Sequence, residues 1–80
     1  MCLTKNKSIK QLKTLIGEYV LITCFDSKNN ICGSTKTIFT KEVFDYYVNK
    51  LNTGMIKTKS ITHIQANNFS RYDITFILKN

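Results

Sequence analysis

The chain has 80 residues, 42% of them hydrophobic, and a formal net charge of +7 that lysine supplies almost alone, since Arg71 is the only arginine. This length predicts one small basic domain, residues 1–80 with residues 1–7 flexible, and the hydrophobic fraction excludes a disordered basic tail. No run of 18 apolar residues occurs, and no continuous apolar stretch follows the basic N-terminus, so we expect neither a membrane span nor a secretory signal. The cysteines are odd in number and have no zinc-like spacing, which favours a reducing cytoplasmic location without a metal or another cofactor.

The first predicted helix covers Ser8–Ile16. Ser8 can serve as its N-cap, and Gln11, three residues later, can complete a capping box. The apolar stripe of this helix consists of Ile9, Leu12 and Ile16. Gly17 then stands where a left-handed C-cap belongs, so the helix is expected to end there.

Two strands are expected next, joined as a hairpin. Glu18–Phe25 is β-branched and aromatic and carries apolar residues on both parities, which indicates a central strand. Residues 26–30 form a turn cluster, and Ile31–Phe39 returns as a strand richer in threonine and serine. Cys24 and Cys32 flank the turn, and we expect small buried thiols there rather than a disulfide or a metal site; Cys2 has no partner of this kind.

The second half of the chain repeats the order helix, strand, strand. Thr40 caps a helix that ends at residues 52–54, and its apolar face consists of Val43, Phe44, Tyr47, Val48 and Leu51. Met55–Ala66 is a long strand whose apolar parity changes near Ser60–Ile61, which predicts a bulge or a bend. After a turn over residues 67–70, Arg71–Lys79 alternates cleanly between apolar and polar side chains.

The α-β-β-α-β-β order predicts an α+β fold with a four-stranded, mainly antiparallel sheet and both helices on one face. The opposite face is then left toward solvent or a partner. Ile31–Phe39 and Met55–Ala66 are the expected edge strands, although the strand order stays open. An unpaired edge could also join a second copy in a homodimer.

One family resemblance rests on the same order of elements. With Glu18 directly after a helix that ends Leu15-Ile16-Gly17, the chain resembles homing endonucleases of the LAGLIDADG type. Lys13 and Thr14 stand where that family's motif has small, close-packing residues, and the chain is shorter than a typical monomeric member. We therefore infer no membership.

Lysine side chains gather in two regions of the sequence. The N-terminal cluster consists of Lys5, Lys7, Lys10 and Lys13. The predicted open face of the sheet carries Arg71, Asp73 and Thr75 and, from the neighbouring strand, Lys57, Lys59 and His63. The residues expected to bind a partner are Lys5, Lys7, Lys10, Lys13, Lys57, Lys59 and Arg71, with Tyr46 as an exposed aromatic contact. Tyr72, Phe76, Phe44 and Tyr47 have core parities, so no base-stacking platform is expected.

Together these patterns predict a small non-enzymatic binding module that acts by occupancy on nucleic acid or on an acidic nucleoprotein surface. His63 is the single histidine, and no nucleophile–base pair or paired carboxylates can be assembled, so no catalysis is expected. The alternative is a small inhibitor of the kind that phages and mobile elements use to block a host protein machine, anti-CRISPR proteins among them. Phosphate binding should weaken steeply with salt, whereas protein binding through an apolar core should respond mildly.

Overall fold

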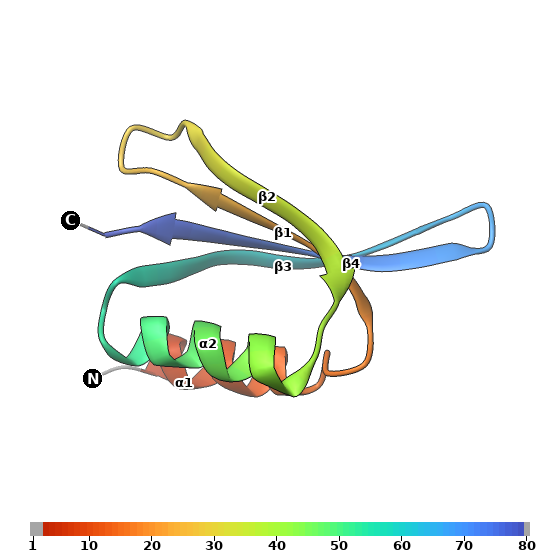
Figure 1. Cartoon of the computed structure of the whole chain (residues 1–80), viewed down its shortest axis with the longest axis horizontal. Helices are drawn as coiled ribbons and strands as arrows, with labels where there is room; N and C mark the ends of the chain where they lie inside the picture. Colours follow the sequence, from red (N-terminus) through yellow and green to blue (C-terminus); the bar gives the residue numbers. More distant parts are fainter. Residues whose placement is uncertain (1–2, 80) are drawn as a thin grey trace.

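The structure, a computed structural model, describes residues 3–79, and of residues 3–6 it describes the backbone alone. Its elements are α1 (Leu3–Lys13), β1 (Tyr19–Phe25), β2 (Ile31–Ile38), α2 (Lys41–Asn52), β3 (Ile56–Ala66) and β4 (Phe69–Leu78). Both helices lie side by side on one face of a four-stranded sheet (Figure 1), which confirms the predicted α+β fold and the order of its elements. Of the helices within residues 3–79, neither is long and apolar enough to cross a membrane.

The sheet consists of two hairpins joined side by side. Its strand order is β2-β1-β4-β3, in which β1 and β4 pair in parallel and the other neighbours are antiparallel. β1, which is apolar on both parities, and β4, which alternates most cleanly, therefore occupy the centre of the sheet. β2 and β3 are the edges, as predicted from their polar composition.

The core lies between the sheet and the two helices. Its buried side chains are Leu12, Leu15, Val20, Ile22, Phe39, Leu51, Ile56, Ile74 and Phe76. Burial of each large side chain contributes roughly 1.5–3 kcal/mol to the stability of the fold. Because side chains alternate along a strand, the inward direction of Val20, Ile22, Ile74 and Phe76 turns the residues between them to the opposite face.

The first helix differs from its prediction at both ends. It begins at Leu3, so it includes most of the segment expected to be flexible, and Ser8 is a buried residue inside the helix rather than its N-cap. After the helix, three i→i−3 backbone hydrogen bonds of 3.0–3.4 Å tighten the chain. This tightening turns Leu15 into the core and leaves Ile16 38% exposed, so the predicted stripe was wrong at its last position. Gly17 has a φ of 97°, as expected of the C-cap.

The second helix agrees closely with its prediction. Thr40 is the N-cap, and its hydroxyl accepts a hydrogen bond of 3.3 Å from the backbone N–H of Val43. Leu51 is buried near the C-terminal end of the helix, and Thr53 is the C-cap. A local cap and a regular apolar stripe were sufficient to define this element.

The predicted bulge in β3 is confirmed, slightly earlier than expected. The register with β4 shifts between Thr58 and Ser60 and leaves Lys59 without a paired residue. The extra residue reverses the parity of the strand beyond it. His63 therefore pairs with Tyr72, onto which it stacks with ring centroids 4.7 Å apart, and its predicted position on the open face was wrong.

The turn between β3 and β4 is tighter than predicted. Asn67 and Asn68 have φ angles of 53° and 63°, the left-handed pair that a two-residue hairpin turn requires. β4 therefore begins at Phe69 rather than Arg71. In Figure 1 this hairpin extends beyond the two helices, so its tip projects from the body of the domain.

Candidate functional site

The open face of the sheet, the side away from both helices, carries most of the features that distinguish this molecule. Strand pairing assigns to it Ile31, Ser34, Lys36 and Ile38 of β2, Tyr19, Leu21, Thr23 and Phe25 of β1, Phe69, Arg71, Asp73, Thr75 and Ile77 of β4, and Lys57, Ser60, Thr62 and Ile64 of β3, with Lys59 at the bulge. Large apolar side chains remain exposed there, with Ile31 66% and Phe69 46% accessible. An uncovered face with large apolar residues is typical of an interaction surface.

The charges of the open face are mainly positive. Lys36 lies opposite Leu21, Lys57 lies opposite Ile77, and Lys59 holds its Nζ 5.1 Å from the centre of the Phe25 ring. Among the residues of this face, Asp73 is the one carboxylate.

Arg71 is engaged with that carboxylate. Its Nε donates a hydrogen bond of 2.7 Å to Oδ1 of Asp73, and this bond raises the pKa of the guanidinium. The half-exposed pair neutralises the single acid of the face. The three lysines are therefore left as uncompensated charges.

Aromatic rings lie at both ends of β1 on the same face. The Tyr19 and Phe69 rings contact edge to face, with centroids 5.4 Å apart, and Phe25 lies at the other end of the strand. The sequence pattern did not identify Tyr19 or Phe25 as outward-facing rings. β1 is apolar on both parities, so the pattern did not show which of its residues point inward. The burial of Val20 and Ile22 shows that the residues that alternate with them face outward.

The predicted binding residues divide between two sides of the molecule. Lys57, Lys59 and Arg71 share the open face, Lys57 and Lys59 at its Phe25 end and Arg71 at its Tyr19 end, whereas Lys7, Lys10 and Lys13 are exposed on α1, in the helix layer. Lys5 also belongs to α1, but its side chain is outside the described ones. One flat partner cannot contact both clusters at once.

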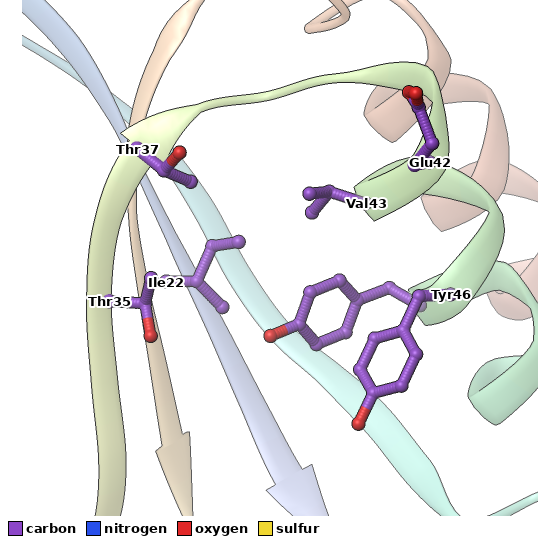
Figure 2. Close-up of a pocket in the computed structure, with 7 residues that line it drawn as sticks. Ile22, Thr35, Thr37, Glu42, Val43 and Tyr46 are labelled. Atoms are coloured by element: carbon purple, nitrogen blue, oxygen red, sulfur yellow. The ribbon is translucent and has the colours of Figure 1, made fainter.

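Tyr46 lies in neither cluster. It is 56% exposed on α2, with Nζ of Lys50 5.0 Å from its ring centre. Figure 2 shows it beside a groove between α2 and β2, and this groove of about 270 Å³ is lined by Ile22, Thr35, Thr37, Glu42, Val43, Tyr46 and Tyr47. The groove exists because the helices leave β2 uncovered, and its volume is below the usual range of ligand pockets, about 300–1,000 Å³.

The two cysteines of the first hairpin are free thiols. Cys24 is half-buried, whereas Cys32 is exposed, so the expectation of two buried thiols was wrong for Cys32. Burial, followed by the interaction with Cys32, raises the pKa of Cys24 to about 11, and the Cys32 thiol donates to the Cys24 carbonyl oxygen at 3.2 Å. Cys2 lies outside the described residues. A thiol with a raised pKa is a weak nucleophile at neutral pH.

The single histidine contacts a hydroxyl. Nε2 of His63 lies 2.5 Å from Oγ of Ser70 near the tip of the second hairpin. The described contacts of His63 include no carboxylate, so the pair has no third group to orient the imidazole as in a catalytic triad. Within residues 3–79, no three side chains of His, Cys, Asp or Glu gather closely enough to hold a metal ion.

Comparisons with known proteins give no assignment. No protein-family model matches the chain, and neither a curated protein nor a solved structure matches it. The functional conclusion therefore depends on the open face itself.

Proposed function

We propose that the open face binds nucleic acid, free or within a nucleoprotein complex. The protein acts by occupying the nucleic acid and catalyses no reaction on it. The observation that carries this proposal is that Lys36 on one edge of the sheet and Lys57 and Lys59 on the other share a face whose single carboxylate, that of Asp73, is neutralised by Arg71. Lysines that neutralise phosphates release condensed counterions, which supplies most of the affinity of a sequence-independent binder.

The kind of binding follows from the side chains available. Lysine provides a mobile point charge, whereas the two parallel contacts that read guanine require an arginine fork. The one arginine of the face already donates to Asp73. The proposed binding is therefore electrostatic and weakly sequence-specific, and we infer a cytoplasmic location, where thiols such as Cys24 and Cys32 stay reduced.

A fluorescence-anisotropy titration tests the proposal, with labelled single- and double-stranded DNA and RNA at low and at physiological salt. The wild-type protein is expected to bind saturably and to lose affinity as salt rises. The double variant Lys57→Glu/Lys59→Glu reverses two charges at one end of the open face. It is expected to lower the affinity by at least about tenfold, since each lost phosphate contact and each new repulsion weakens binding.

A matched control keeps the same change of net charge away from this face. Lys41→Glu/Lys50→Glu alters the first and the last turn of α2, in the helix layer, and it should leave the affinity within about twofold. If Lys10→Glu/Lys13→Glu on α1 removed binding while Lys57→Glu/Lys59→Glu did not, the interface would be the helix layer and the proposal would be wrong.

A second candidate function is inhibition of a host protein machine by occupancy. The observation that favours it is the edge of β2, on which Ile31 and Ile38 are exposed and with which no strand within residues 3–79 pairs on the outer side. Such an edge can add a strand from a partner through main-chain hydrogen bonds. Absence of nucleic-acid binding even at low salt, together with salt-insensitive binding to a protein partner, would favour this candidate.

A further inference from the structure

Two aromatic sites lie at opposite ends of one strand on the open face. At the start of β1 the Tyr19 and Phe69 rings contact edge to face at 5.4 Å, and at the end of β1 Phe25 lies beneath Nζ of Lys59 at 5.1 Å. β1 has seven residues, so at about 3.3 Å per residue the two sites are about 20 Å apart. Each ring can receive a base by stacking, which is worth about 1–3 kcal/mol per base.

A line of hydroxyl groups crosses the sheet between the two aromatic sites. Strand pairing aligns Thr23 with Ser34 on one side and with Thr75 on the other, and Thr75 in turn with Ser60. All four strands thus contribute one short hydroxyl side chain to the same row. A hydroxyl both donates and accepts hydrogen bonds, so it can pair with either the donor or the acceptor groups of an unpaired base.

Cations accompany both aromatic sites. Lys57 pairs across the sheet with Ile77, which is itself paired with Phe25, and Lys59 lies over the Phe25 ring. At the other end, Val20 pairs with Tyr72, so Arg71 lies on the strand next to Tyr19, with its guanidinium held by Asp73. Stacking surfaces with flanking positive charge are the features by which proteins hold a single strand, whose bases are exposed, rather than a duplex.

We propose that the occupant of the open face is a single-stranded nucleic acid that stacks one base on Phe25 and another on the Tyr19–Phe69 pair, while the intervening nucleotides cross the hydroxyl row. This inference rests on the proposed function and adds the strand state and the length of the ligand. A stacked strand advances about 3.4 Å per nucleotide, so about 20 Å corresponds to about six steps, which join about seven stacked nucleotides, and to fewer extended ones. The minimal ligand is therefore about four to seven nucleotides long.

A length series tests this bridging. Labelled oligothymidylate and oligouridylate of two to ten nucleotides are titrated by anisotropy at one low salt concentration, with equal numbers of molecules. Affinity is expected to rise by at least about tenfold between three and seven nucleotides, when one strand first reaches both sites, and only slowly thereafter. The DNA and RNA arms tell which sugar the face prefers, and a duplex of ten base pairs should bind more weakly than either single strand.

Variants at one aromatic site separate bridging from general attraction. Phe25→Leu, which retains an apolar side chain but removes the ring, should remove the rise with length while ten-nucleotide strands still bind. Thr23→Val/Thr75→Val should weaken seven-nucleotide ligands and leave two-nucleotide ligands unchanged. Ile16→Ala, at an exposed position at the end of the helix layer, is the control and should keep the full rise.

The outcomes distinguish the two proposals. If long strands bind but affinity increases smoothly with length, or equally in the wild type and in Phe25→Leu, the bridging is wrong and the nucleic-acid function stands. A preference for the duplex also overturns the bridging. If no oligonucleotide binds at any length, both proposals are wrong.

Discussion

Thr58 carries a buried hydroxyl oxygen, Oγ1, for which the described part of the chain offers no hydrogen-bond partner. The residue pairs with Phe76 directly before the bulge, on the helix side of the sheet. An unsatisfied buried hydroxyl costs about 1–3 kcal/mol of desolvation. Thr58→Val keeps the shape and the strand preference and removes the polar atom, so the free energy of unfolding is expected to rise by about 1 kcal/mol.

Urea denaturation measures this change directly. Thr62→Val is the comparison, because Thr62 is an exposed threonine of the same strand and its hydroxyl remains hydrated. The variant at Thr62 should change the stability by less than about 0.5 kcal/mol. Equal effects at both positions would mean that strand preference, not the buried hydroxyl, determines the result.

The raised pKa of Cys24 predicts a difference in thiol reactivity. Its pKa is about 11 instead of 9.0, so at pH 8 the exposed Cys32 should react with iodoacetamide first. The Cys24 rate should increase about tenfold per pH unit up to about pH 11. Mass spectrometry of peptides after short exposure, in a Cys2→Ser background, resolves the two sites; equal rates at pH 8 would contradict the burial of Cys24.

The raised pKa of Cys24 also predicts how the stability of the fold depends on pH. The folded state holds the Cys24 proton more tightly than the unfolded chain does. The stabilisation that the protonated Cys24 thiol gives the folded state is therefore fully present below about pH 9 and is lost as the pH rises toward 11. The melting temperature of the wild type should fall over this window more than that of Cys24→Ala.

At the scale of elements, the Asn67–Asn68 turn determines where the second hairpin ends. Both residues have positive φ, which costs about 1–2 kcal/mol for most L-residues but little for asparagine or glycine. Asn68→Gly is expected to raise the free energy of unfolding by up to about 1 kcal/mol, and Asn68→Val to lower it by about 1–2 kcal/mol. Urea denaturation compares them with Lys28→Gly, at a turn position without positive φ, which should be destabilising.

Local signals in the sequence predicted which helices and strands form more reliably than the residues at which they begin and end. Thr40 and the stripe that follows it predicted α2 because both act within one or two turns. Ser8 looks like an N-cap locally, but the helix starts earlier and buries it. The bulge that reverses the parity of β3 is defined by the pairing of β3 with β4. Local sequence does not show this pairing, so His63 was assigned to the wrong face.

The candidate site was predictable in Lys57, Lys59 and Arg71 but not in Lys36 or in the rings of β1. Lys57, Lys59 and Arg71 stood out because the surrounding pattern alternates. Tyr19 and Phe25 did not, because β1 is apolar on both sides and only the packing of its neighbours against the helices reveals the outward residues. A central strand of a half-covered sheet hides its exposed face in this way.

For the molecule as a whole, the grouping of cations predicts the salt dependence of binding. If the three lysines of the open face neutralise up to three phosphates of a single strand, log K should fall with log salt with a slope of about −2. Lys57→Gln should reduce the magnitude of this slope by about 0.7. Anisotropy at five salt concentrations measures it, and a slope near zero would exclude phosphate contacts.

The parallel pairing of β1 with β4 has a consequence for how the chain acquires its structure. Each hairpin closes through contacts that are near in sequence, whereas Val20 meets Tyr72 only after almost the whole chain, including α2, is in position. Contacts of such long separation slow folding, because the loop must be closed before they form. We expect the joining of the two hairpins to limit the folding rate. The core combines buried residues of both halves, so separate halves of the chain should gain order only when mixed.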